Sequence, residues 1–191
     1  NELTGNTTLS GIINSKSWKE IQQARYTQKP YLGYSLVSLD QLFAGTKNLH
    51  NYKFTFDCKL IQDRNTSNFV NSYINALIAI VQKYHLENNV YIESQSALFL
   101  SVLKGKMPEL KLFIYPESFD SGLKTALELG ICGITISTRD ITSEQIKEAH
   151  NNNLMVAIWN TLSESDNIDA IKKNPDFIQT DKVRNLIKLL K

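Results

Sequence analysis

The sequence has few of the residues that mark disulfide-bonded, membrane-spanning or dinucleotide-binding proteins. Its 191 residues include only two cysteines, three histidines and four prolines. Two cysteines are too few for a disulfide framework, so we expect Cys58 and Cys132 to be buried free thiols. The longest apolar run, around residues 76–81, is too short to span a bilayer. The sequence contains no GxGxxG, GxxxxGK[ST] or GxSxG motif.

The composition is that of an ordinary globular protein without a strong charge. Hydrophobic residues make up 42% and charged residues 21%, and the net charge is +2. A chain so close to neutral has no field that favours nucleic acid or an anionic membrane. The sequence therefore predicts no nucleic-acid partner and no transmembrane segment. The length suits one domain, predicted over residues 1–191.

The first third of the chain is predicted to be irregular, with two short helices. Residues 1–16 are rich in Thr, Asn, Gly and Ser, which indicates an extended loop. Ser17 and Glu20 have the spacing of a capping box at the start of a helix over 17–26. Ser38 is the predicted N-cap of a second helix, which ends at Gly45.

Strand and helix patterns alternate over the remainder of the chain. Each of six apolar strand-like segments is followed by a segment of helical period. The predicted strands are KFTFDCKL (53–60), NVYIES (89–94), LKLFIY (110–115), CGITIS (132–137), LMVAIW (154–159) and DFIQT (176–180). This order predicts an α/β fold with a parallel sheet, of the (β/α)8 TIM-barrel type. Such barrels need about 250 residues, so we expect two further strands before Asn1.

The first predicted strand has an acid and a base on one face. Side chains alternate along a strand, so Asp57 and Lys59 share a face opposite the phenylalanines of KFTFDCKL. In a barrel the outer face packs on helices, and active sites lie at the C-terminal ends of the strands. Asp57 and Lys59 are therefore predicted to line a site at the barrel mouth. An internal ion pair is the structural alternative.

Other strands also end in polar or aromatic side chains. Glu93 is hard to explain as packing, and Trp159 either stacks on a ligand or belongs to the core. Asp181 has the place of an N-cap for the last helix. His85 and His150 lie near helix C-termini, where the helix dipole favours them, and no histidine follows a strand. The candidate site residues are therefore carboxylates, a lysine and an aromatic ring.

In their order and spacing, these motifs resemble those of the glycerophosphodiester phosphodiesterase family. The similar segments are LTGNTTLSG (3–11), VSLDQLF (37–43), Asp57-Cys58-Lys59, VYIESQ (90–95), VAIWNT (156–161) and Thr180-Asp181. The resemblance extends over essentially the whole chain. It implies the C-terminal part of a TIM-type barrel, from about the third strand onward, and hydrolysis of a glycerophosphodiester to an alcohol and glycerol phosphate.

The resemblance also implies roles for individual residues. Asp57 takes the place of a ligand of a divalent cation, Ca²⁺ or Mg²⁺, and Lys59 that of a phosphate-binding group. Glu93 and Trp159 take substrate-binding positions. The catalytic histidines of the family would lie before Asn1, so no catalytic residue is expected within this chain.

Three positions depart from the family pattern: Asp57 stands where Glu is usual, Glu93 replaces Gln, and Asn160 replaces Thr. These departures leave an alternative open, a non-catalytic barrel that binds a phosphorylated or sugar ligand. A further alternative is a Schiff-base lyase with Lys59 as nucleophile. Location is open between cytoplasmic and exported. Unpaired sheet edges would favour self-association, so we expect that this chain alone is not a stable, complete monomer.

Overall fold

The structure is a computed structural model that describes residues 2–60 and 67–191. Contacts divide the chain into two compact units, Asn1–Leu49 and His50–Lys191. The long helix expected from about Ser67 to His85 is present and extends from Ser67 to Lys83. That residues 1–191 form one domain stays a prediction.

The first unit consists of irregular chain with short helices. Single antiparallel bridges join Glu2 to Ile12 and Thr7 to Tyr26, and the described part of 1–16 otherwise contains only a short 3-10 helix. The capping box predicted at Ser17 is present, and Ser38, the predicted N-cap of the second helix, also forms a capping box. The first helix is shorter than the predicted 17–26. The helices of this unit are η1 (Ile13–Ser15), α1 (Trp18–Ile21) and α2 (Leu39–Gly45), and η2 (Leu49–Asn51) follows at its end.

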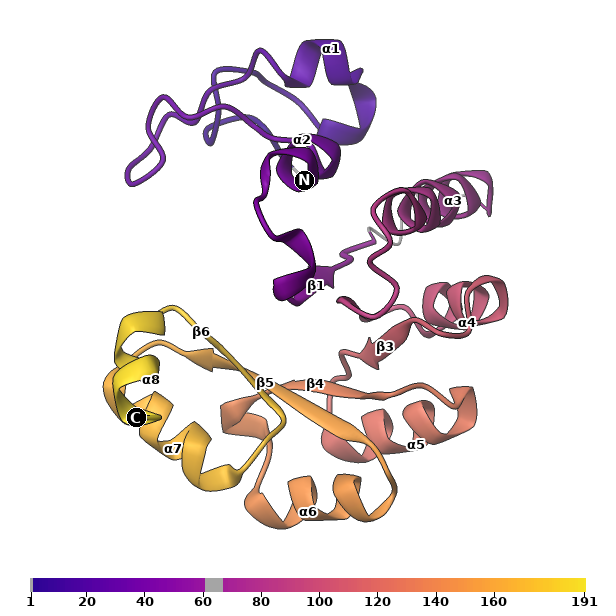
Figure 1. The fold of residues 1–191 in the computed structure, drawn as a ribbon, viewed down its shortest axis with the longest axis vertical. Helices are drawn as coiled ribbons and strands as arrows, with labels where there is room; N and C mark the ends of the chain where they lie inside the picture. The colour runs from indigo at the N-terminus through magenta and orange to yellow at the C-terminus, as the bar shows by residue number, and fades with distance from the viewer. Residues whose placement is uncertain (1, 61–66) are drawn as a thin grey trace. The chain divides into compact units, whose positions relative to one another are not determined.

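The second unit contains the six predicted strands, joined by helices (Figure 1). All pairings are parallel, and the strands lie side by side in chain order. The strands are β1 (Phe54–Asp57), β2 (Val90–Ser94), β3 (Lys111–Ile114), β4 (Gly133–Ser137), β5 (Met155–Thr161) and β6 (Phe177–Thr180). The connecting elements are α3 (Ser67–Lys83), α4 (Ala97–Lys106), α5 (Phe119–Leu129), η4 (Thr138–Asp140), α6 (Ser143–Asn151), α7 (Glu164–Lys173) and α8 (Val183–Leu189).

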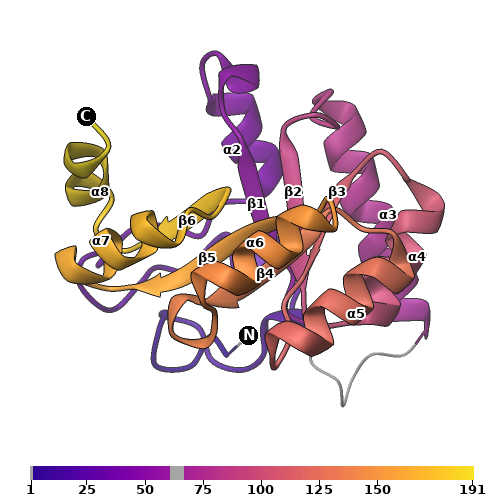
Figure 2. The ribbon, with the colours of Figure 1, turned by 90° about the horizontal axis from the view of Figure 1, so that it is seen from below.

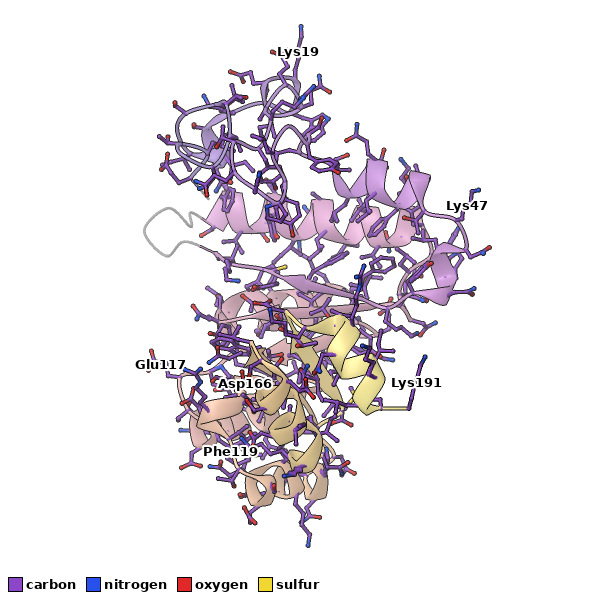
Figure 3. All side chains as sticks on the ribbon, turned by 90° about the vertical axis from the view of Figure 1, so that its left-hand side faces the viewer. Lys19, Lys47, Glu117, Phe119, Asp166 and Lys191 are labelled. Carbon is purple, nitrogen blue, oxygen red and sulfur yellow. The ribbon has the colours of Figure 1, made fainter. Side chains whose placement is uncertain are left out.

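Helices α4, α5 and α6 pack against the strands and form an outer layer of the unit (Figures 1 and 2). On β2, β3, β4 and β5 the residues on this side are aliphatic and almost fully buried, since this face meets helices. They include Ile92, Leu112, Ile134, Val156 and Ile158. Side-chain caps begin two of the helices: Ser118 caps α5 at Phe119, and Ser163 caps α7, where Asp166 lies in the first turn (Figure 3).

The opposite face of the sheet is the concave inner side, and aromatic rings meet across it. The ring of Tyr91 on β2 lies 5.0 Å from that of Phe177 on β6, and Phe113 on β3 lies 6.1 Å from Phe177. Strands β2 and β6 are not neighbours in the sheet. These ring contacts therefore span the interior and support the curvature that a barrel requires.

Several local expectations are confirmed or corrected. Cys58 is buried, Cys132 is half-buried, and both are free thiols. Strand β1 ends at Asp57, so Lys59 lies beyond it and not within it. The prediction of Asp181 as a helix cap is wrong: α8 has Lys182 at its N-cap without a side-chain bond, and the hydroxyl of Thr180 accepts the Lys182 N–H. None of the described helices has the length and apolarity needed to cross a bilayer.

Candidate functional site

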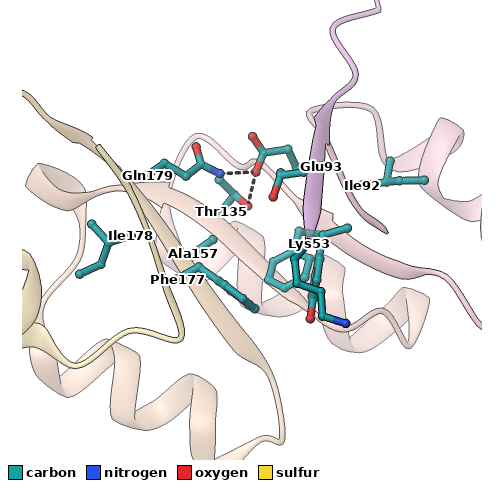
Figure 4. Close-up of a pocket in the computed structure, with 11 residues that line it drawn as sticks. Lys53, Ile92, Glu93, Thr135, Ala157, Phe177, Ile178 and Gln179 are labelled. Carbon is teal, nitrogen blue, oxygen red and sulfur yellow. Dashed lines mark hydrogen bonds between the residues drawn. The ribbon is translucent and has the colours of Figure 1, made fainter. Parts of the chain in front are cut away.

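The four residues predicted for the site line one cavity at the C-terminal ends of the strands. We call it the mouth cavity; its volume is about 260 Å³ and its walls are Asp57, Lys59, Glu93, Tyr115, Thr135, Trp159 and Gln179. An inner cavity of about 210 Å³ lies on the concave face of the sheet (Figure 4). The two cavities share Glu93, Thr135 and Gln179. The structure thus brings Asp57, Lys59, Glu93 and Trp159 together in the lining of one cavity.

Asp57 and Lys59 form an ion pair at the end of β1. The Lys59 ammonium donates to Asp57 Oδ2. Their side chains are 39% and 67% exposed, respectively, so the pair lies at the surface and not in the core. A pair this exposed contributes about 0–1 kcal/mol to stability, which is a weak structural reason for its presence. Either side chain can therefore leave this ion pair and contact a ligand instead, at a small cost in free energy.

Glu93 is the buried carboxylate of the mouth cavity. Only 6% of the residue is exposed, and it lies beside Asp57 in the pairing of β2 with β1. Its Oε2 accepts hydrogen bonds from Thr135 Oγ1 at 2.9 Å and from Gln179 Nε2 at 2.8 Å (Figure 4). The bond to Gln179 joins β2 to β6 across the interior. Buried carboxylates need such partners, and these two fix the side chain in one orientation.

Two aromatic rings form another part of the wall. Tyr115 follows β3 and Trp159 lies on β5, and their rings meet edge to face with centroids 5.4 Å apart. Burial raises the pKa of the Tyr115 hydroxyl, and the negative charges of Glu93 and Asp140 raise it further. Among the described residues, the Trp159 Nε1 is buried without a hydrogen-bond partner.

The strand that carries Trp159 is irregular at its C-terminal end. The pairing of β5 with β6 shifts register between Ile158 and Thr161. Asn160 lies within this shift and has a φ of 69°, a left-handed conformation that Asn tolerates better than most residues. Irregularities of this kind re-aim side chains next to functional sites. Asn160 is therefore a residue type that is compatible with this local backbone.

The donors of the mouth cavity fit a hard divalent cation by type, but their number is small. Asp57 and Glu93 offer carboxylate oxygens, the ligands that Ca²⁺ and Mg²⁺ prefer. Within residues 2–60 and 67–191 there is no group of three or more His, Cys, Asp or Glu side chains able to hold a metal ion. Cation binding at Asp57 accordingly stays a proposal.

The histidines lie outside both cavities. None of the three lines the mouth cavity or the inner cavity. His150 Nε2 lies 3.0 Å from Asp176 Oδ2, which also accepts the Val156 N–H at 2.7 Å. This arrangement gives His150 a structural partner.

Three residues of the mouth cavity were missed in the sequence: Tyr115, Thr135 and Gln179. Thr135 was hidden within the apolar run CGITIS, and Tyr115 lies one residue beyond β3. The available signal was strand alternation, which places Thr135 on the face opposite Ile134 and Gln179 on the face opposite Ile178. No local motif marks Gln179, because its role arises from a contact with β2 that is 86 residues away in the chain.

A parallel α/β sheet of barrel type, with polar side chains at its C-terminal end, defines the class of fold. No protein-family model matches the sequence, and no curated protein does either. Solved structures, however, match closely in shape. A glycerophosphodiester phosphodiesterase from Parabacteroides distasonis matches with a TM-score of 0.79 at 18% identity, over 93% of this chain and 72% of that one.

Two further structures are similar. A glycerophosphodiester phosphodiesterase from Agrobacterium tumefaciens gives a TM-score of 0.76 at 12% identity, over 98% of this chain and 78% of that one. An Oleispira antarctica phosphodiesterase, solved with the product sn-glycerol-3-phosphate, gives 0.81 at 13% identity, over 99% and 76%. The expected resemblance to these phosphodiesterases is confirmed in the fold. That two strands precede Asn1 stays a prediction.

Proposed function

We propose that this protein is a glycerophosphodiester phosphodiesterase that hydrolyses its substrate to an alcohol and glycerol phosphate. The observation that supports this most is the mouth cavity, where Asp57, Lys59, Glu93 and Trp159 meet at the strand ends. The sheet around it has the fold of phosphodiesterases, and one of these holds sn-glycerol-3-phosphate.

In this proposal Lys59 binds the phosphate. Its ammonium is exposed and, within the part of the chain that the structure describes, pairs with Asp57, so it can turn toward a phosphoryl oxygen. A fixed positive charge there offsets negative charge that develops on the phosphoryl group in the transition state. Trp159 and Tyr115 supply apolar walls that position the organic part of the substrate and limit access of water.

Asp57 is proposed to hold a divalent cation, Ca²⁺ or Mg²⁺. When bound, such a cation supplies Lewis-acid stabilisation of the phosphoryl oxygens. The residues named here bind and orient the substrate, and no proton transfer is assigned to them because no histidine lines the cavity.

The test is release of glycerol phosphate from glycerophosphodiesters, measured with added Mg²⁺ or Ca²⁺ and again after treatment with a chelator. We expect turnover that the chelator abolishes and that added cation restores. Turnover that is indifferent to chelation would exclude the cation at Asp57. Saturable binding of the substrate without any turnover, with cation present, would instead support the non-catalytic alternative.

A further inference from the structure

The charges of the mouth cavity are not balanced. Three charged side chains line it: the carboxylates of Asp57 and Glu93 and the ammonium group of Lys59. Asp57 and Lys59 pair with each other and neutralise each other's charge. Among the described residues, the partners of the Glu93 carboxylate are the neutral donors Thr135 and Gln179. Within the described lining of the cavity, Glu93 is thus the carboxylate that no basic side chain pairs with.

The Glu93 carboxylate is also left with one oxygen to spare. Both of its hydrogen bonds end on Oε2. Among the described residues, Oε1 has no hydrogen-bond partner. It is not one of the fully buried side-chain atoms without a partner, so it is accessible at the wall of the cavity. The bonds to Oε2 hold the side chain in place, so Oε1 forms a preorganised acceptor on the cavity wall. Such an acceptor suits a ligand group that donates hydrogen bonds or carries positive charge.

The wall next to Glu93 is aromatic. Tyr115 and Trp159 line the same cavity, and the charge of Glu93 acts on the Tyr115 hydroxyl. Aromatic faces attract organic cations, and Trp attracts them most strongly. A carboxylate beside a Trp–Tyr pair is a combination that favours an ammonium group over a neutral alcohol.

We infer that the mouth cavity selects zwitterionic phosphodiesters, whose phosphate lies at Lys59 and whose alcohol carries an ammonium group that binds Glu93. This inference rests on the proposed function. Lys59 provides the positive charge that binds the phosphate, and Glu93 provides the negative charge that binds the ammonium group. A substrate with a neutral alcohol leaves the Glu93 carboxylate without a cationic partner from the alcohol, and its described partners are neutral donors.

A divalent cation shared by Asp57 and Glu93 is the competing occupant. It would need several oxygen ligands, whereas Glu93 has one oxygen already engaged by two donors and the described residues contain no group of three candidate ligands. The test therefore follows substrate preference and cation requirement in the same variant.

The experiment compares the protein with its Glu93→Gln variant on glycerophosphoethanolamine, glycerophosphocholine and glycerophosphoglycerol. Gln keeps the shape and an acceptor oxygen for Thr135 and Gln179, and it removes only the charge. We expect kcat/KM for the two zwitterions to fall roughly 10- to 100-fold, as loss of a charged hydrogen bond or ion contact implies. Activity on glycerophosphoglycerol should be unchanged or higher. Glu117→Gln, at an exposed carboxylate in the loop after β3 that does not line the cavity, is the matched control.

The same variants are tested for direct binding of the three compounds by calorimetry, with and without Mg²⁺. Equal loss of activity on all three, or a raised Mg²⁺ requirement in Glu93→Gln, overturns the inference and leaves the proposed function intact. If the protein hydrolyses none of the compounds, the proposed function fails; binding that favours the zwitterions and loses that preference in Glu93→Gln still supports the inference. Equal binding of all three overturns it.

Discussion

At the scale of single residues, Lys59 is the side chain on which the proposed phosphate contact depends. Replacing Lys59 by Met should lower kcat/KM for any glycerophosphodiester roughly 10- to 100-fold, because a charged hydrogen bond to the phosphate is lost. Stability should change little, since the pair with Asp57 is exposed. Steady-state assays and urea unfolding of the same preparation measure both effects.

The matched control is Lys147→Met, which removes an exposed lysine from α6, far along the chain from the cavity residues. It should leave kcat/KM within about twofold, because surface charges that do not touch the substrate act only through screened fields. If the Lys59→Met variant keeps full activity, Lys59 does not bind the phosphate of the substrate.

Cys58 should be a slow, unreactive thiol. Burial raises its pKa, although the Tyr73 hydroxyl, 3.5 Å from the sulfur, opposes this in part. The thiolate is the reactive form, so alkylation of Cys58 should lag behind that of the half-buried Cys132. Mass spectrometry of the two peptides after brief treatment with iodoacetamide measures the two rates. Equal rates in the folded protein would contradict this expectation.

The same thiol links stability to pH. Its folded pKa lies above the unfolded value of about 8.5, so the unfolded chain loses the proton first as pH rises. The stabilisation is complete below about pH 8.5 and is lost as pH rises through the folded pKa. Tyr73, whose pKa burial also raises, acts in the same direction at higher pH. The free energy of unfolding in urea should therefore decrease above about pH 8.5, and less so in Cys58→Ala.

The lining of the mouth cavity could be predicted from the sequence only in part. Asp57, Lys59, Glu93 and Trp159 could be proposed because charged or aromatic side chains at the C-terminal ends of apolar strand patterns are a local signal. Thr135 and Gln179 gave no such signal, because their role is to bind Glu93 from strands far away in the chain. Partners of a buried charge are a tertiary property, and alternation within one strand cannot reveal them.

At the scale of secondary structure elements, close packing of β4 on β5 depends on Gly133. A Cβ at this position would lie 2.2 Å from the Met155 carbonyl oxygen and 2.7 Å from Phe113 Cε1. Gly133→Ala should therefore reduce the free energy of unfolding by about 3 kcal/mol or more, since the backbone of a central strand cannot move aside cheaply. Urea unfolding measures the change.

Gly105 in α4 is the control for this substitution. A Cβ there meets nothing within 4 Å. Gly105→Ala should stabilise the protein by about 0.5–1 kcal/mol, because Ala is the better helix former. A stability loss in both variants would mean that the contacts around Gly133 are not the cause.

The elements themselves were largely predictable, and their ends were less so. All six strand–helix units follow from alternation of strand and helix periods, which burial on both faces of a parallel sheet enforces. The helix expected over 17–26 ends at Ile21 because the chain turns toward the bridge between Arg25 and Ser35. Helix α8 begins at Val183, and its N-cap is Lys182 and not Asp181, because the pairing of β6 with β5 reaches Thr180.

At the scale of the whole molecule, the curvature of the sheet is held by contacts between strands that are not neighbours. The order β1 to β6 leaves each outer strand with one partner among the described strands. Tyr91, Phe113 and Phe177 meet across the concave face, and the bond from Gln179 to Glu93 lies one step nearer the mouth. The aromatic cluster and the site residues therefore form successive layers of one interior, as in a barrel.

This layering predicts that the aromatic cluster supports both stability and substrate binding. Phe177→Ala removes the ring contacts that join β6 to β2 and β3, and it should cost about 2–4 kcal/mol in unfolding free energy, since Phe177 is only half-buried. The loss should also loosen Gln179, two residues further along β6, and so raise KM more than it lowers kcat. Leu98→Ala, at a side chain on α4 that is 72% exposed, is the control and should shift stability by less than about 0.5 kcal/mol. Urea unfolding and steady-state kinetics on the same samples measure both effects. A Phe177→Ala variant with lowered stability but unchanged KM would show that the aromatic cluster stabilises the sheet without positioning the residues of the mouth cavity.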